Sequence, residues 1–347
     1  MGMSEIVVAT GANSRFFLMA CLLMQSLKNS GLTFYVCDFG LSTLERQFFA
    51  GSGSLLEMPL GNPRVANGAH PWVLKTELGS YFAAAQSWSK VTWIDADIVV
   101  ADLFSQMLRA LSSQMDREGL SVAAAAEGTF SDILGLKNLD LEPFLHAVEA
   151  RRISTSTPYF NAGFVVFNSR SVLDEWASVA GATRFHALYD QNILNLILAS
   201  SNKVLPLKQE LWNIRGSLLA NSSPDAIVNG ATPRGLVFHA TSPNAADLER
   251  FACAMPSHAT PQYEMRLFTN PYLRSFQFKL IDEFIAENQM ALQAMGISVA
   301  GIDGRPPHCL STQSPIRFCV PRNRRCPCQS GERYKHCHGA SNQMQIN

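Results

Sequence analysis

The chain has 347 residues, in which 28 Lys and Arg side chains balance 28 Asp and Glu side chains. Its 47% hydrophobic content is typical of a globular protein with a sizeable core and excludes a disordered or fibrous chain. The zero net charge excludes a whole-chain field that would attract nucleic acid or an anionic membrane. Residues 301–347 nevertheless hold seven basic and two acidic side chains, an imbalance that predicts two modules.

No membrane span is expected from the sequence. The longest apolar run near the start, FFLMACLLM at 16–24, has nine residues, whereas a helix needs about 20 to cross a bilayer. Of the eight cysteines, three are scattered in apolar surroundings and five lie in the last 40 residues. This distribution favours buried thiols and a metal site in a reducing compartment over a secreted disulfide scaffold. We therefore expect a cytoplasmic protein.

Strands and helices alternate along most of the chain. Strands are predicted at 6–10, 32–38, 90–100, 120–126, 159–168, 203–207 and 236–239. Helices are predicted up to about residue 28 and at 72–85, 104–114 and 187–199. This alternation predicts an α/β fold with a parallel sheet covered by helices on both faces.

Two aspartates interrupt the apolar strand predicted at 90–100. Asp95 and Asp97 stand in TWIDADIVV, where burying two carboxylates is costly unless they are paired or bound to a cation. In an extended chain, residues i and i+2 face the same side, so both carboxylates are expected to bind one hard divalent ion. The alternative is a strand end with two solvated aspartates.

Three further polar segments follow in the sequence. In YFNAGFVVFN, Asn161 and Gly163 either let the backbone approach a polar ligand closely or form an ordinary strand with a glycine bulge. In DQNILN, Asp190 and Gln191 open a predicted helix, where Asp190 is either a site residue or a plain N-cap. His239 follows an apolar strand and is structural unless it is a partner of the aspartates.

Taken in this order, the segments resemble the family 8 glycosyltransferases, which have a GT-A fold. The resemblance covers roughly residues 5–245 and implies an α/β fold with a mostly parallel central sheet flanked by helices. It is carried by IVVATGANSRFF at 6–17, VCDFGLS at 36–42, WVLKTELGSYF at 72–82, WIDADIVV at 93–100, YFNAGFVVFN at 159–168, DQNILN at 190–195 and VFHATS at 237–242.

The resemblance implies a metal site and a catalytic pair. Asp95, Asp97 and His239 match the residues that hold Mn²⁺, with Mg²⁺ as the alternative, against the donor diphosphate. Asp190 and Gln191 match the pair beside the anomeric carbon, where an oxygen would stabilise an oxocarbenium-like sugar.

The resemblance also implies a donor-binding set. Thr10 and Asn13 fall in the first loop, which surrounds uridine and ribose. Lys75 matches a basic residue that contacts donor phosphate or sugar, Asn161 matches a residue at the donor sugar, and Asp95 also lies near the ribose.

Two positions depart from the family pattern. The family's late histidine is usually followed by a loop that ends in Lys-Pro-Trp, whose lysine meets the diphosphate. Here the segment reads HATSPNAADLER, so either Arg250 or Lys75 compensates, or diphosphate binding is weaker. Gly11 stands where many relatives carry an acid, which removes an expected contact to the base.

The C-terminal segment 321–340, PRNRRCPCQSGERYKHCHGA, has Cys-x-Cys, eight residues, then Cys-His. Four such ligands within 13 residues fit a closed tetrahedral Zn²⁺ site, which a segment this short needs in order to fold. A free thiol cluster is the alternative. The segment resembles the SEC-C motif, whose ligands match Cys326, Cys328, Cys337 and His338. His336 is an alternative fourth ligand, although the spacing favours His338.

In relatives the SEC-C motif is a small docking tag for proteins or ribosomes. The basic side chains around the motif would suit an acidic protein surface or RNA phosphate, or would only keep the tail soluble. The expected organisation is a GT-A domain at 1–300, a linker at 301–320, the SEC-C motif at 321–340 and a tail at 341–347.

We therefore expect a bacterial, metal-dependent, retaining hexosyltransferase. It would move a hexose from a nucleotide sugar, with UDP favoured, to an acceptor hydroxyl. One alternative is a non-catalytic scaffold or adaptor that docks through the SEC-C motif. A weaker alternative is a nucleotidyltransferase, because a related sheet with paired carboxylates can also hold a metal nucleotide.

Overall fold

The computed structural model describes residues 6–59, 61–62, 69–83, 90–215, 235–241, 248–253, 263–295 and 297. A seven-stranded sheet runs through the middle of the molecule in the order β3-β2-β1-β4-β7-β6-β8. Its strands are β1 (Ile6–Ala12), β2 (Thr33–Asp38), β3 (Leu55–Leu56), β4 (Lys90–Ile94), β6 (Val122–Thr129), β7 (Pro158–Phe167) and β8 (Val204–Leu207). The α/β architecture with a mostly parallel sheet is as predicted.

One strand departs from the predicted parallel order. β7 pairs antiparallel with both of its neighbours, β4 and β6, while the remaining neighbours in the sheet are parallel. β7 is buried along nearly its whole length, as are β1 and β4. Because a strand buried on both faces is continuously apolar in either direction, the sequence pattern could not reveal that β7 is reversed.

Two small antiparallel sheets complete the strands that the structure describes. β5 (Ile98–Val100) pairs with β9 (Val237–His239), and β10 (Leu248–Cys253) pairs with β11 (Tyr263–Phe268). The single strand predicted at 90–100 is therefore two strands in different sheets, separated by a turn at 95–97. The strand predicted at 236–239 likewise joins β5 instead of extending the main sheet.

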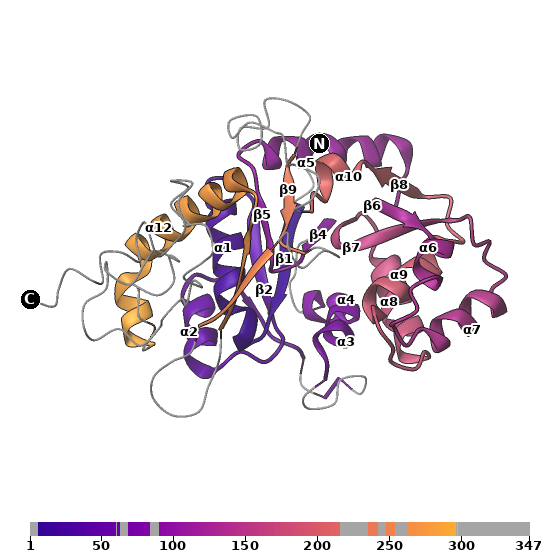
Figure 1. Ribbon diagram of the computed structural model, residues 1–347, viewed down its shortest axis with the longest axis horizontal. Helices are drawn as coiled ribbons and strands as arrows, with labels where there is room; N and C mark the ends of the chain where they lie inside the picture. The colour runs from indigo at the N-terminus through magenta and orange to yellow at the C-terminus, as the bar shows by residue number, and fades with distance from the viewer. Residues whose placement is uncertain are drawn as a thin grey trace, which may run out of the picture.

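Helices cover both faces of the main sheet, as Figure 1 shows. On one face, α3 (Pro71–Thr76), α4 (Leu78–Phe82), α8 (Arg170–Gly181) and α9 (Tyr189–Leu198) pack together. On the other face lie α1 (Phe17–Leu27), α5 (Phe104–Glu118) and α12 (Pro271–Ala294). The shorter helices are η1 (Ser14–Phe16), α2 (Thr43–Gly51), α6 (Phe130–Leu134), α7 (Glu142–Ala150) and α10 (Gln209–Trp212).

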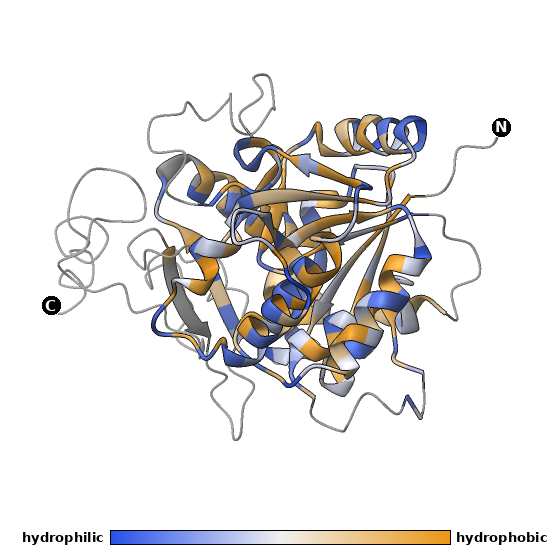
Figure 2. Cartoon of the chain, turned by 90° about the vertical axis from the view of Figure 1, so that its right-hand side faces the viewer, coloured by the Kyte–Doolittle hydropathy of each residue, from blue (hydrophilic) through white to orange (hydrophobic). Residues whose placement is uncertain are grey.

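The central strands divide their side chains between the two layers. In β1, Val7 and Ala9 belong to the core under α3 and α4, whereas Ile6 and Val8 belong to the core under α5. This alternation follows from the period of two in an extended chain. Figure 2 shows hydrophobic residues along the central strands and mixed colours on the covering helices. Among the helices of the described residues, none is both long and apolar enough to span a membrane.

Candidate functional site

A cavity of about 540 Å³ opens at the carboxyl ends of β1 and β4. Ligands bind at this position in open α/β sheets because the loops that follow parallel strands meet there. The residues that line it are Gly11, Phe16, Phe39, Pro71, Trp72, Lys75, Trp93, Asp95, Ala96, Asp97, Glu127, Ile133, Leu136, Leu139, Asn161, Gly163, Leu188, Asp190, Gln191, Arg215, His239, Thr241 and Arg266. Polar groups come from strand ends and from α9, and an apolar wall comes from the segments around α3 and α6.

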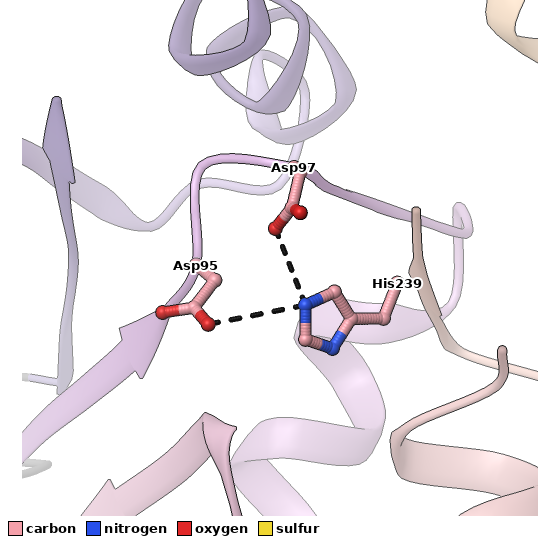
Figure 3. Close-up of side chains that lie close together, drawn as sticks. All are labelled: Asp95, Asp97 and His239. Carbon is pink, nitrogen blue, oxygen red and sulfur yellow. Dashed lines mark ion pairs between the residues drawn. The ribbon is translucent and has the colours of Figure 1, made fainter. Parts of the chain in front are cut away.

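Asp95, Asp97 and His239 meet at one side of this cavity (Figure 3). His239 Nε2 lies 3.2 Å from Asp97 Oδ1 and 3.8 Å from Asp95 Oδ2, and one ligand atom of each residue lies within 4.8 Å of the others. His239 reaches the two aspartates because β5 pairs with β9, which places Ile98 opposite His239. The two aspartates therefore approach each other through a turn after β4, and the predicted extended geometry is wrong.

The contact of His239 Nδ1 with Asn213 fixes the direction in which Nε2 points. Nδ1 lies 2.9 Å from Asn213 Oδ1, and an amide oxygen can only accept, so the proton belongs on Nδ1. Nε2, the other ring nitrogen, faces the carboxylates of Asp95 and Asp97. A divalent cation between these groups would bind all three side chains, and carboxylate oxygens with one imidazole suit Mn²⁺. The residues present therefore fit the metal that the sequence predicts.

Gly163 is needed to make room for this histidine. A Cβ atom at Gly163 would lie 2.4 Å from His239 Cε1 and 2.9 Å from Asn161 Oδ1. The same glycine also anchors the turn at 95–97, because Asp95 N donates to Gly163 O over 2.8 Å. The glycine predicted to allow close approach of a ligand instead accommodates a side chain of the protein itself.

Lys75 lies between two carboxylates. Its Nζ is 2.8 Å from Asp95 Oδ1 and 2.8 Å from Asp190 Oδ2, and the lysine side chain is only 5% exposed. Trp93 Nε1 donates to the same Asp95 oxygen over 2.7 Å. Burial opposes the charge of Lys75, but Asp190 and Asp95 outweigh burial and raise its pKa. The lysine is thus a permanent cation that fixes Asp95 and Asp190 relative to each other.

A hydrogen-bonded cluster joins β7 to α9 at the adjacent wall. Gln191 Oε1 accepts from Asn161 Nδ2 and from Ala162 N, each over 3.1 Å. Asn161 Nδ2 also donates to Glu127 Oε2 over 2.8 Å, and Glu127 pairs with Arg215 over 2.5 Å. The cluster holds the amide oxygen of Gln191 in a fixed direction beside the cavity.

The helix that carries Asp190 and Gln191 begins with an unusual backbone. Leu188, which precedes α9 and lines the cavity, has φ 55°, a left-handed conformation that a bulky residue rarely adopts. Asp190 does not act as a side-chain N-cap here, since no side-chain cap bond closes the start of α9. The N-cap alternative that the sequence left open is therefore not what the structure shows.

Asp97 has a second cationic neighbour, Arg266 on β11. The Arg266 guanidinium pairs with Asp97 through Nη1 and donates to Glu264 through Nε over 2.5 Å. Burial alone would raise the pKa of Asp97, but His239 and Arg266 hold that pKa at about 2. Asp97 is thus ionised at neutral pH and bears the countercharge on this side of the cavity.

Two of the predicted donor-binding residues do not line the cavity. Thr10 is fully buried in β1, and its hydroxyl has no hydrogen-bond partner among the described residues. The Asn13 side chain accepts from Phe16 N over 3.2 Å and so caps η1. Gly11 does line the cavity, but a Cβ there would lie 2.1 Å from the ring of Phe39. An aromatic ring therefore fills the space that a larger residue at position 11 would need.

Sequence reasoning missed three polar residues that line the cavity, Glu127, Arg215 and Arg266, and also Asn213, which contacts His239 from outside the lining. Glu127 offered a signal, because it is a carboxylate directly after the apolar strand segment 122–126, as Asp95 is after β4. Arg266 offered none, since it stands in the middle of the strand YEMRLF. The alternative compensating residue Arg250 lies on β10, and its side chain is outside the described residues.

The comparisons with known proteins concern two parts of the chain. The SEC-C motif family matches residues 322–340, a segment that contains the predicted zinc ligands and lies outside the described residues. A search of curated proteins finds no match to the chain.

Among solved structures, the WbbM bifunctional glycosyltransferase is similar at 17% identity and a TM-score of 0.46, over 70% of this chain and 46% of that one. The galactosyltransferase LgtC, in complex with donor and acceptor sugar analogues, is similar at 18% identity and a TM-score of 0.43, over 68% and 87%. The glycosyltransferase GlyE of Streptococcus pneumoniae is similar at 15% identity and a TM-score of 0.43, over 83% and 64%. The chain thus spans about half the length of WbbM, and likenesses at this level carry no functional inference.

Proposed function

We propose that the chain is a metal-dependent glycosyltransferase that moves a hexose from a nucleoside diphosphate sugar, with UDP favoured, to an acceptor hydroxyl. The observation that carries the proposal is the orientation of His239. Its Nε2 faces Asp95 and Asp97 while Nδ1 is engaged by Asn213, an arrangement that suits a divalent cation bound by all three side chains. The resemblance of the cavity-lining motifs to family 8 glycosyltransferases supports the donor class and retention of the anomeric configuration.

The metal, held by Asp95, Asp97 and His239, would supply Lewis-acid neutralisation of the departing diphosphate. Lys75 holds Asp95 and Asp190 in place through its two ion pairs, so that both side chains are positioned before a ligand binds. Asp190 presents a carboxylate beside the cavity, and Gln191, which accepts from Asn161 and Ala162, would offer its amide oxygen to a sugar by exchanging one of these two donors. An oxygen at this position would stabilise an oxocarbenium-like sugar.

The test is isothermal titration of the protein with UDP in the presence and absence of Mn²⁺. We expect binding that depends on Mn²⁺ and that weakens at least about tenfold in Asp97→Asn, because the variant loses one anionic ligand. Asp116→Asn is the control: Asp116, like Asp97, pairs with a cationic side chain, in this case Lys90, but it lies outside the cavity. UDP affinity that is equal with and without Mn²⁺ would overturn the proposal, and a panel of UDP sugars would follow a positive result.

We propose in addition that the SEC-C segment binds one Zn²⁺ through Cys326, Cys328, Cys337 and His338. The match of that family to residues 322–340 supports this proposal. Cys337→Ser should release the zinc, as measured by elemental analysis, and leave Mn²⁺-dependent UDP binding unchanged. Loss of both would show that the tail and the cavity are one unit.

The second candidate function is a non-catalytic scaffold that docks through the SEC-C segment, which the same family match favours. Absence of UDP binding in protein that retains its zinc would select it. The free thiols of Cys21 and Cys37, both buried, support our proposal of a cytoplasmic location.

A further inference from the structure

Three cationic side chains, Lys75, Arg215 and Arg266, line the cavity within the described part of the chain, and they differ in what holds them. Lys75 is fixed by two carboxylates that both belong to the cavity. Arg215 is paired with Glu127, which also takes part in the Asn161–Gln191 cluster. Lys75 and Arg266 each share a carboxylate with the proposed metal, Asp95 and Asp97 respectively. Among these three cations only Arg266 also pairs with a carboxylate outside the lining of the cavity, that of Glu264.

The guanidinium of Arg266 is anchored along one edge. Its Nε donates to Glu264 over 2.5 Å, and Glu264 also pairs with the exposed Arg15. The guanidinium carbon lies 4.9 Å from the centre of the Phe16 ring, which also lines the cavity. Glu264 and Phe16 thus fix the plane of the guanidinium, while its other edge, through Nη1, faces Asp97.

A divalent ion bound to Asp97 would weaken the ion pair between Asp97 and the Nη1 edge of Arg266. One carboxylate neutralises a single positive charge, so an arginine and a divalent ion on Asp97 compete for it. The Nε edge keeps its own countercharge in Glu264, and Arg266 can therefore lose Asp97 without being left unpaired. The planar fork of a guanidinium matches the oxygens of a phosphate group, and the donor diphosphate is the anion that a metal at this site would bring.

We propose that Arg266 is a diphosphate-binding arm that occupies Asp97 when the metal is absent and turns to the donor diphosphate when the metal is bound. The inference rests on the proposed function and deepens it. It also supplies the cation that the sequence lacks after His239, where the expected Lys-Pro-Trp is missing. Lys75 cannot take that role without giving up Asp95 and Asp190.

The proposal predicts effects of opposite sign on two ligands. In Arg266→Ala, Mn²⁺ alone should bind about threefold tighter or more, because its competitor for Asp97 is gone. UDP with Mn²⁺ should bind about tenfold weaker or more, the loss expected for one or two charged hydrogen bonds. A merely structural arginine would weaken both ligands together.

The experiment measures free Mn²⁺ by electron paramagnetic resonance and UDP binding by calorimetry on the full chain. Arg266→Lys keeps the charge without the fork and should recover part of the UDP affinity. Arg15→Ala is the matched control, since it removes the exposed arginine on the other side of Glu264 and should change neither affinity. Thermal unfolding of each variant checks that it is folded.

The outcomes separate the inference from the function on which it rests. Wild-type protein that binds Mn²⁺ but not UDP overturns both. Wild-type binding of UDP with Mn²⁺, together with unchanged affinities in Arg266→Ala, overturns the role of Arg266 and leaves the transferase proposal intact. Tighter Mn²⁺ binding with weaker UDP binding in Arg266→Ala, and wild-type values in Arg15→Ala, supports it.

Discussion

Lys75 and Arg266 reach the Asp95–Asp97 turn from opposite sides of the cavity, and the protein holds them in different ways. Lys75, on α3, is 5% exposed and sits between Asp95 and Asp190. Arg266, on the hairpin of β10 and β11, is 16% exposed and has a second carboxylate partner, Glu264, outside the lining of the cavity. The lysine therefore cannot leave without uncovering two carboxylates, whereas the arginine can exchange one of its two partners. In our proposal Lys75 is the fixed cation that positions Asp95 and Asp190, and Arg266 is the replaceable cation that binds the donor diphosphate.

The largest effect that tests this difference is on stability. Lys75→Met should lower the free energy of unfolding by about 3–5 kcal/mol, because it leaves two carboxylates facing each other without their shared cation. Arg266→Met should lower it by only about 1–2 kcal/mol, since Asp97 retains His239 and Glu264 retains Arg15. Guanidinium denaturation measures both.

A second buried lysine, Lys90, provides the control for this comparison. Lys90 is 4% exposed, like Lys75, but its partner Asp116 is 51% exposed and can rehydrate. Lys90→Met should therefore lower the free energy of unfolding by less than Lys75→Met. Equal losses for Lys75→Met and Arg266→Met would remove the distinction between a fixed and a replaceable cation.

The side of the cavity that holds Lys75, Asp190 and Gln191, called here the fixed side, also depends on one buried amide, that of Asn195. Asn195 is completely buried; its Oδ1 accepts from Phe160 N over 2.7 Å, and its Nδ2 donates to Phe160 O and Gln191 O, each over 2.8 Å. Asn195→Ala should cost about 2–3 kcal/mol, because it leaves backbone groups of β7 buried without partners. It should also loosen α9, which carries Asp190 and Gln191, against β7.

The control for Asn195 is the more exposed Asn168, which also donates to backbone, at Leu120 O. Asn168→Ala should cost less than about 1 kcal/mol, since water replaces the lost bonds. Hydrogen exchange would show whether α9 alone opens in Asn195→Ala. A loss no larger than that of Asn168→Ala would mean that Asn195 does not hold the fixed side together.

The sequence predicted the residues of the site better than the path that joins them. Asp95 and Asp97 stood out because they interrupt an apolar stretch, and His239 was assigned to them through the resemblance to family 8 glycosyltransferases. Their contact depends on β5 leaving the main sheet to pair with β9. No local pattern encodes this, because three apolar residues such as Ile98–Val100 fit either sheet equally well.

Residues that reach the site from the middle of an element were not predictable. Arg266 alternates with apolar neighbours in β11, a pattern that predicts a solvent-facing side chain as readily as a cavity-facing one. Its direction is decided by how the β10–β11 hairpin packs on α1 and α12, which is a long-range property. Thr10 is the converse case, because a polar residue within a strand can have its side chain fully buried.

The smallest predicted effect is the loss of unfolding free energy at acid pH that comes from Asp97, the carboxylate paired with Arg266. Asp97 has a folded-state pKa of about 2, against an ordinary value of 3.8, because His239 and Arg266 outweigh its burial. A depressed pKa stabilises the fold above the ordinary value, and this contribution is lost as the pH falls through 2. Between pH 5 and pH 2 the wild type should lose about 2 kcal/mol more unfolding free energy than Asp97→Asn.

Denaturant titrations at several pH values measure this difference. The contributions of all other acidic residues cancel, because the wild type and Asp97→Asn share them. The exposed Asp102→Asn serves as the control and should run parallel to the wild type, because Asp102 is outside the cavity. Parallel curves for wild type and Asp97→Asn would show that His239 and Arg266 do not favour the charged form of Asp97. In that case Arg266 would gain nothing by holding Asp97 in the metal-free protein, and the contrast with Lys75 would lose its energetic basis.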